Sequence, residues 1–405
     1  MPGTSMHAET GMPAEQASIT FDRIFPDPSA CVISARLDPG DAAWLDFDES
    51  TLDLMAAGFS LCCGEIPVIC HEASTSPLVL DFLRDCGHEP GAKLLTYRNS
   101  AQLHALQARC IASGRRLINQ HVPTTSLFPD HAYVVPVPLQ QFLNDKSSLP
   151  QLVPAPHVPL RRVVSLAELG RMPFDGPVVL KPVSRFPTGG GCGVCLVRQA
   201  EEWGPARSRL SDKAACLQAV VVETFLDLVA SWCAQVAISD DGIVYLGAPR
   251  QNIAMDGSYL GNCHGVGFEP PPGVEALARL IAERGRALGY RGFAGFDIGL
   301  TTQGPLQVFD LNFRVNGSLR QLLFDHQIRR SAGCSQNLTL KTVTGFQHLI
   351  DRVRPFVERG QYFPQAGIDG SRHPTGISRM SGYVAASDAA ALQALEAAIH
   401  CGLAC

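Results

Sequence analysis

The sequence lacks the features of membrane-spanning, exported and nucleic-acid-binding proteins. No apolar run reaches the roughly 18 residues that a transmembrane helix needs. The N-terminus has no basic stretch followed by an apolar one, as a secretory signal would. Lysine and arginine form no basic track, and 33 basic against 38 acidic residues give a net charge of −5. We therefore expect a cytoplasmic protein that binds neither nucleic acid nor membranes, with a disordered leader over residues 1–17.

Paired metal-binding cysteine motifs are also missing. The chain has 14 cysteines, but only Cys192 and Cys195 form a C-x-x-C pair. A structural zinc site would need a second pair at matching spacing. We expect most of the cysteines to be buried thiols in a reducing compartment.

The length and the pattern of apolar residues favour several domains. With 405 residues the chain exceeds the ~250 to 300 residues at which single cores stop growing. Residues 18–140 alternate short apolar runs with helical patterns, which predicts an α/β domain with a mainly parallel sheet. Residues 332–405 predict a small α+β segment that packs on the core or forms a homodimer contact. The most informative motifs lie between these two parts, in residues 141–331.

One motif places three different polar groups on the same side of a strand. In the run Val308–Ser318, a strand would point Asp310, Asn312 and Arg314 to one face. Burying such groups without partners is costly, and a divalent cation with an anionic ligand would satisfy them. A solvated face of an edge strand is the alternative.

The preceding predicted strand, Gly292–Leu300, brings a second carboxylate to this face. With a turn within Thr301–Pro305, Asp297 lies opposite Asp310 or two residues from that position. Opposed carboxylates destabilise a sheet unless something neutralises them. Magnesium, which takes one or two carboxylates together with phosphate oxygens, is therefore predicted here.

A glycine-rich segment follows a buried strand that ends in a lysine. Pro177–Pro182 contains Lys181, and glycines at 189–193 follow it. Glycines let the backbone approach an anion closely, and a lysine adds a point charge. The segment is neither a P-loop nor a dinucleotide fingerprint, because the lysine precedes the glycines. A phosphate-binding loop and a plain hairpin turn both remain open.

Two further segments are predicted to contact ligands. Residues 249–270 have the composition of a long loop that carries Arg250 and His264, and loops of this length are usually functional, although a plain surface loop is the alternative. Asn316 and Gly317 lead into a predicted helix with Ser318 as its cap, where a substrate carboxylate could bind.

Together these residues resemble the ATP-grasp superfamily over residues 141–331. The ordered set that carries the resemblance comprises Lys146, Lys181 before the glycine loop, Glu223 at a predicted strand end, Asp297 and Asp310-x-Asn312-x-Arg314. The preceding α/β unit and the Asn-x-Arg-x-Asn-Gly-Ser run resemble the subgroup of the pheganomycin-type peptide ligase. The resemblance implies α/β and α+β architecture: a pre-ATP-grasp domain (18–140), an ATP-grasp domain (141–331) and a small C-terminal domain (332–405).

The resemblance also implies roles for individual residues. ATP would be bound by Lys146, Lys181, Thr188, Gly189, Gly190, Gly191, Gly193, Glu223, Phe225 and Leu226. Two magnesium ions would be held by Asp297, Asp310 and Asn312. The catalytic residues would be Arg314, Lys181 and Arg250, and the substrate-binding residues Asn316, Gly317, Ser318 and His264. Two positions depart from the family: Asp310 stands where glutamate is usual, and no counterpart of the ribose-binding acidic residue can be chosen within residues 227–231.

The implied activity is ATP-dependent ligation of a carboxylate to an amine through an acyl phosphate. The partners would be small molecules, namely amino acids or peptides, in natural-product biosynthesis. One alternative is an ATP-grasp enzyme with a thiol or a non-amino-acid amine as nucleophile. Another is a regulatory protein that binds nucleotide without turnover, which would tolerate loss of Arg314.

Overall fold

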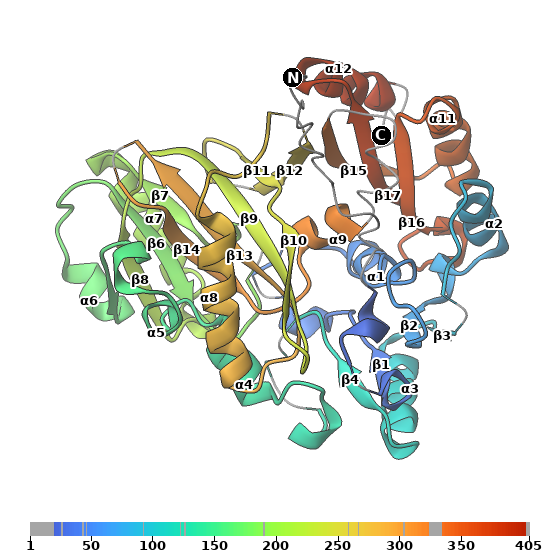
Figure 1. Cartoon of the computed structure of the whole chain (residues 1–405), viewed down its shortest axis with the longest axis horizontal. Coiled ribbons are helices and arrows are strands. Elements are labelled where there is room, and N and C mark those ends of the chain that lie inside the picture. The colour runs from blue at the N-terminus through green and yellow to red at the C-terminus, as the bar shows by residue number, and fades with distance from the viewer. Residues whose placement is uncertain are drawn as a thin grey trace, which may run out of the picture.

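The computed structural model describes residues 20–401 except for 26, 43, 46, 92, 122, 125–126, 189–190, 258, 266, 303 and 324–333. The predicted leader, residues 1–17, lies outside the described residues. Figure 1 shows three parts: an N-terminal unit in blue and cyan, a green lobe, and a large sheet that runs from yellow to red. None of the helices within the described ranges is long and apolar enough to cross a membrane.

The N-terminal unit is built on a four-stranded parallel sheet in the order β3-β2-β1-β4. The prediction of a parallel α/β unit is therefore confirmed. Polar side chains begin its helices, because Asp48, Ser76 and Asn99 each accept a hydrogen bond from a first-turn backbone N–H. The elements are β1 (Cys31–Ile33), α1 (Glu49–Ala57), β2 (Val68–His71), α2 (Pro77–Asp85), β3 (Leu94–Tyr97), α3 (Ser100–Ala112) and β4 (Arg116–Ile118).

A second, antiparallel sheet of four strands forms the green lobe in Figure 1 and has the order β5-β8-β6-β7. Two helices, α4 (Val137–Asn144) and α5 (Leu149–Leu152), lead into it. Its apolar residues form their own core with Trp203 of α7 and with Trp44, which comes from the N-terminal unit. Its elements are β5 (Arg161–Val164), α6 (Leu166–Arg171), β6 (Val178–Val183), β7 (Cys195–Val197), α7 (Ala200–Ser211) and β8 (Ala219–Thr224).

The third sheet has nine strands and extends through the second half of the chain. Its order is β14-β13-β9-β11-β12-β15-β17-β16, with β10 also paired to β9. The strands are β9 (Leu228–Ile238), β10 (Ile243–Gly247), β11 (Arg250–Ile253), β12 (Tyr259–Gly265), β13 (Gly292–Thr301), β14 (Gln307–Asn312), β15 (Cys334–Thr342), β16 (Tyr362–Ile368) and β17 (Ser378–Ala386). The helices are α8 (Val274–Ala287), α9 (Gly317–Leu323), α11 (Phe346–Glu358) and α12 (Ala389–His400).

Two parts of this sheet differ from the sequence-based expectation. Residues 249–270 were predicted to be a loop, but they contain the β11–β12 hairpin. Glycine and asparagine are rare in strands, so local propensity favoured a loop and the pairing with neighbouring strands overrides it. The hairpin also joins the C-terminal segment, because Cys263 of β12 pairs with Gln336 of β15. The C-terminal strands therefore continue the large sheet instead of forming a separate one.

Helix α8 holds the two strands that carry the predicted metal ligands. Its apolar face, with Leu277 and Ile281, belongs to one core cluster with Phe296 of β13 and with Phe313, which follows β14. Gly285 lies so close to Phe313 that a Cβ atom there would stand 2.3 Å from the Phe313 ring. This contact fixes the end of β14 relative to the helix.

Candidate active site

A cavity of about 690 Å³ lies between the small antiparallel sheet and the large sheet. Lys181 of β6 and Glu223 of β8 line it from one side, and Asp297 and Asp310 line it from the other. Several other predicted ligands line it as well: Lys146, Gly191, Phe225, Leu226, Arg250 and all residues from 227 to 231, where the ribose contact was expected. The fold therefore brings most of the predicted nucleotide-binding residues to one place.

The two predicted metal-binding aspartates face each other across neighbouring strands. Asp297 of β13 pairs with Asp310 of β14, as one of the two registers considered from the sequence requires. Burial, and then the Asp310 charge, raise the pKa of Asp297 to about 6. Its Oδ1 atom is buried and has no hydrogen-bond partner among the described residues. An unpaired carboxylate oxygen beside a second carboxylate fits a divalent cation.

Lys146 holds Asp310 in the ionised form. Its Nζ lies 2.9 Å from Asp310 Oδ1 and 3.0 Å from Oδ2. Burial alone would raise the pKa of Asp310, but the charges of Lys146, Lys181 and Arg314 outweigh burial and lower it. Asn312 is buried at the end of β14 and lines an adjoining cavity with both aspartates. The three predicted metal ligands, Asp297, Asp310 and Asn312, therefore line one cavity.

A β-bulge changes the predicted position of Phe309. Asp297 pairs with Asp310 but Ile298 pairs with Val308, so Phe309 is an extra residue on β14. Strict alternation predicts that Phe309 points away from Asp310, yet Phe309 lines the same cavity. The Lys181 ammonium lies 5.6 Å from the centre of its ring. A bulge of this kind depends on strand pairing, which alternation along one strand does not reveal.

Lys181 is buried and paired with the glutamate predicted to lie near the adenine. Its Nζ donates to Glu223 Oε1 at 2.5 Å and to the carbonyl oxygen of Phe309 at 2.7 Å. Arg161 lies 3.2 Å from the other Glu223 oxygen. Burial lowers the pKa of Lys181 and the Glu223 charge opposes that effect. An ammonium has three donors, so one remains for a phosphate oxygen.

The glycine-rich segment lies against Arg314 and the N-terminal unit. Arg314 Nη2 donates to the carbonyl oxygen of Thr188 at 3.0 Å. Gly191 and Gly193 have φ of +80° and +77°, and a Cβ on Gly193 would stand 2.7 Å from Trp44. Only glycine adopts this backbone and fits this contact without strain. Two residues predicted to bind ATP, Gly189 and Gly190, lie outside the described residues.

A second cavity of about 250 Å³ shares Asp297, Asp310 and Arg314 with this region. The three residues predicted to bind substrate, Asn316, Gly317 and Ser318, line it. Residues of the N-terminal unit form part of its wall: Leu45, Phe47, Met55, Gln120 and His121. The cavity therefore lies between the paired aspartates, Asp297 and Asp310, and a wall that the N-terminal unit provides.

The start of α9 is capped by a different residue from the one predicted. Asn316 Oδ1 accepts hydrogen bonds from the backbone N–H groups of Ser318 and Leu319, at 3.1 and 3.2 Å. Ser318 Oγ instead donates to Asn262. The first N–H groups of this short helix are therefore satisfied within the protein, and anionic groups in the cavity would meet the guanidinium groups of Arg314 and Arg320.

His264 lies outside the wall of both cavities. It is on β12, where it pairs with Ser335 of β15. This position gives no support to the predicted contact with substrate. The β11–β12 hairpin instead supplies Arg250, Gln251 and Tyr259 to the main cavity. Sequence reasoning missed Gln251 and Tyr259 because it treated the hairpin as a loop, in which facing residues cannot be identified.

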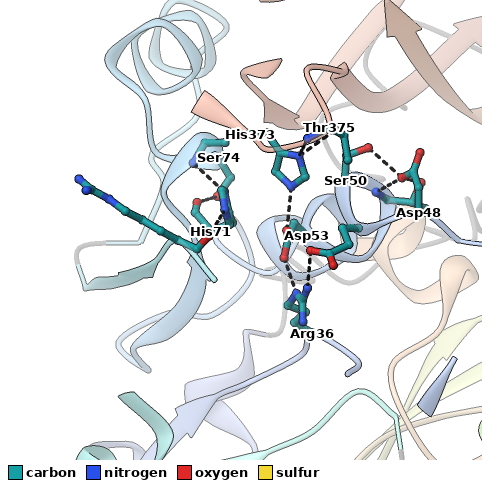
Figure 2. Close-up of polar contacts among 12 residues, drawn as sticks. Arg36, Asp48, Ser50, Asp53, His71, Ser74, His373 and Thr375 are labelled. Carbon is teal, nitrogen blue, oxygen red and sulfur yellow. Dashed lines mark hydrogen bonds and ion pairs between the residues drawn. The ribbon is translucent and has the colours of Figure 1, made fainter. Parts of the chain in front are cut away.

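A separate cluster of potential ligands lies where the N-terminal unit meets the C-terminal strands. Ligand atoms of Asp53, His71 and His373 lie within 4.8 Å of one another. Figure 2 shows Asp53 between Arg36 and His373. Asp53 accepts hydrogen bonds from Arg36 Nε at 2.7 Å, from His373 Nε2 at 3.0 Å and from Tyr97.

Each of these three side chains is hydrogen-bonded within the protein. Nδ1 of His71 accepts the N–H of Ala73 at 3.1 Å, and its Nε2 lies 3.2 Å from the carbonyl oxygen of Arg98. Nδ1 of His373 lies 2.8 Å from the Thr375 hydroxyl. The cluster is therefore a buried network around the Asp53–Arg36 ion pair. The hydrogen bond from His373 to Asp53 ties α1 to the segment before β17.

The fold and the site define the class of protein. A cavity between two antiparallel sheets, with paired carboxylates, two lysines, an arginine and a glycine loop, is the arrangement of an ATP-grasp enzyme. The chain belongs to the ATP-grasp superfamily, among the ligases that form amide bonds with ATP. Residues 159–312 match the family model described as L-aspartate–L-methionine ligase, ATP grasp, and residues 20–141 match the model of the N-terminal domain of the same ligase.

Solved structures share this fold at low sequence identity. N5-carboxyaminoimidazole synthetase from Staphylococcus aureus, crystallised with ADP, aligns with a TM-score of 0.55 and 10% identity over 91% of this chain and 96% of that one. An ADP complex of N5-carboxyaminoimidazole ribonucleotide synthetase aligns with a TM-score of 0.52 and 12% identity over 86% and 93% of the two chains. Pyruvate carboxylase from Rhizobium etli aligns with a TM-score of 0.53 and 12% identity. The alignment covers 90% of this chain and 36% of the pyruvate carboxylase chain.

Proposed function

We propose that the protein joins the carboxylate of one amino acid to the amino group of another through an acyl phosphate. The observation that carries this proposal is the pairing of Asp297 with Asp310 beside Lys146, Lys181 and Arg314, in a cavity between two sheets. Phosphoryl transfer needs mainly positioning and neutralisation of charge. This set of residues supplies both.

In this proposal the lysines bind phosphate oxygens, Asp297, Asp310 and Asn312 bind magnesium, and Arg314 contacts the substrate. Lys181 keeps one donor for a phosphate oxygen, and Lys146 can move from Asp310 to phosphate when a cation takes over the carboxylate. Asp297, Asp310 and Asn312 would hold magnesium, which when bound neutralises the phosphates; we propose two ions. Arg314 bridges the glycine loop and the second cavity, where it can stabilise negative charge on the reacting carboxylate.

We infer that the substrates are an acidic amino acid and an apolar one, with L-aspartate and L-methionine as the first pair to test. The second cavity combines the guanidinium groups of Arg314 and Arg320 with the apolar side chains of Leu45, Phe47 and Met55. Guanidinium groups pair with carboxylates, and an apolar wall suits a thioether side chain. The matched family models carry the names of these two amino acids. A role in natural-product biosynthesis stays a prediction.

A substrate-pair assay tests this function. Purified protein is incubated with ATP, magnesium and all pairs from a panel of amino acids, and ADP and the dipeptide are measured together. The proposal predicts dipeptide and ADP in equal amounts, and only when both amino acids are present. ATP binding without turnover for every pair would favour the regulatory alternative. Turnover that needs a thiol or a non-amino-acid amine would favour the other alternative.

A further inference from the structure

The second cavity contains a histidine with no assigned role. His121 follows β4 of the N-terminal unit and lines the cavity together with Asp297, Asp310 and Arg314. Both of its ring nitrogens are shielded from solvent, and neither has a hydrogen-bond partner among the described residues. Buried polar atoms are almost always hydrogen-bonded, so two unpaired nitrogens in one ring call for a ligand.

The surroundings of this imidazole disfavour its protonated form in the ligand-free protein. Burial first, and the Arg314 charge second, lower the pKa of His121 to about 3. The ring is therefore neutral near pH 7, and one nitrogen offers a lone pair. Phosphate groups bound beside Arg314 would offset its charge and make the ring more basic. Its basicity would then be highest when the acyl phosphate is present.

Several other titratable groups in the same wall already have a partner or hold their proton. Asp297 and Asp310 face each other at the proposed cation site. The Lys146 ammonium donates to Asp310. Burial raises the pKa of Tyr259 far above its ordinary value, so its hydroxyl stays protonated. His121 adds a neutral imidazole to this wall.

We propose that His121 accepts the proton of the attacking amine. The inference rests on the proposed ligase function. In this step the amine nitrogen forms a bond to the carbonyl carbon of the acyl phosphate, and the bond from that carbon to the phosphate oxygen breaks. Phosphate leaves with the electron pair, and one proton passes from the nitrogen to a ring nitrogen of His121. The residue comes from the N-terminal unit, so the active site is complete only when that unit is docked.

Hydroxylamine separates this role from a structural one. It traps acyl phosphates as hydroxamates, and because it is small and largely uncharged at neutral pH, water or buffer can accept the proton that its nitrogen loses. The His121→Asn variant is compared with wild type and with His131→Asn, which changes an exposed histidine of the same unit. Each protein is assayed for dipeptide formation with L-aspartate and L-methionine, and for hydroxamate formation with L-aspartate and hydroxylamine.

The expected result is a loss of dipeptide formation in His121→Asn of about 10²- to 10⁴-fold, the usual contribution of a general base, with hydroxamate formation unchanged. The His131→Asn variant should match wild type in both assays. An equal fall in both products, or no fall beyond that of His131→Asn, would overturn the inference. Absence of hydroxamate and dipeptide with the wild-type protein would instead contradict the proposed function.

Discussion

The carboxylates of Asp297 and Asp310 oppose folding until something neutralises them. Their side chains face each other on neighbouring strands, and the pKa of Asp297 is raised to about 6 by burial and by the Asp310 charge. A carboxyl group whose pKa is higher in the folded than in the unfolded state costs stability as pH rises from the unfolded value, near 4, to the folded value, and the full cost applies above it. The metal-free protein therefore loses stability as pH rises from about 4 to about 6, because the unfolded chain releases the Asp297 proton over this range before the folded protein does.

The Asp297→Asn variant should be more stable and inactive. Removing one of two opposed charges is expected to raise the free energy of unfolding of the metal-free protein at pH 7 by about 1 kcal/mol. Loss of a cation ligand should reduce ADP formation at least ~100-fold, as loss of a key transition-state contact does. Chemical denaturation and the ADP assay measure the two effects. The exposed Asp175→Asn change is the control and should alter neither.

A variant that is both less stable and fully active would contradict the assignment of Asp297 to the cation site. The opposite signs of the two effects make this test specific, because most inactivating substitutions also destabilise.

At the scale of elements, the close packing of α8 on β14 sets the position of the ligands. The Gly285→Ala variant places a methyl group 2.3 Å from the Phe313 ring. Overpacking of this kind costs about 1–3 kcal/mol. The shift of Phe313 should also disturb Asn312, which precedes it, and lower activity. Thermal unfolding and the ADP assay measure both effects.

Gly170 provides the matched control for this substitution. It lies in helix α6, and no atom would come within 4 Å of a Cβ there. Gly170→Ala should be neutral or stabilise the protein by about 0.5–1 kcal/mol, since alanine loses less backbone entropy than glycine. If the two variants had the same stability, the account of α8 packing would be wrong.

Elements with strong local patterns were predictable, whereas pairings between distant segments were not. The strand that carries Lys181 and the opposition of Asp297 to Asp310 follow from alternation and turn length. The bulge at Phe309 and the β11–β12 hairpin follow from pairing with neighbours, which overrides local propensity. The role of His121 depends on how the N-terminal unit docks, and a single histidine outside any recognised motif carries no sequence signal for that.

At the scale of the whole molecule, the buried ion pair around Asp53 ties the N-terminal unit to the C-terminal strands. Burial would raise the pKa of Asp53, but the hydrogen bond from His373, the Arg36 charge and the hydrogen bond from Tyr97 outweigh burial and lower it. A lowered carboxyl pKa stabilises the fold above the unfolded value near 4, and this contribution is lost as pH falls through the folded value.

The Asp53→Asn variant should therefore be strongly destabilised near pH 7 and progressively less so in acid. Breaking a buried pair typically costs about 3–5 kcal/mol, and here it leaves Arg36 with only the half-exposed carboxylate of Glu49. Urea denaturation of both proteins at several pH values measures the gap in the free energy of unfolding. The gap should narrow as pH falls below about 4, the ordinary pKa of an aspartate carboxyl, because the wild type then loses the contribution of the Asp53 charge. A gap that does not vary with pH would contradict the role of the Asp53 charge.

We propose that the carboxylate substrate is activated by phosphoryl transfer at the site of Asp297, Asp310 and Arg314. This activation is tested most directly with L-aspartate labelled with ¹⁸O in its carboxylates, incubated with ATP, magnesium, L-methionine and the wild-type protein. Mass spectrometry of the products then locates the label. An acyl phosphate predicts one ¹⁸O atom in each inorganic phosphate released with ADP. Label in AMP, or phosphate without label while dipeptide forms, would contradict the account.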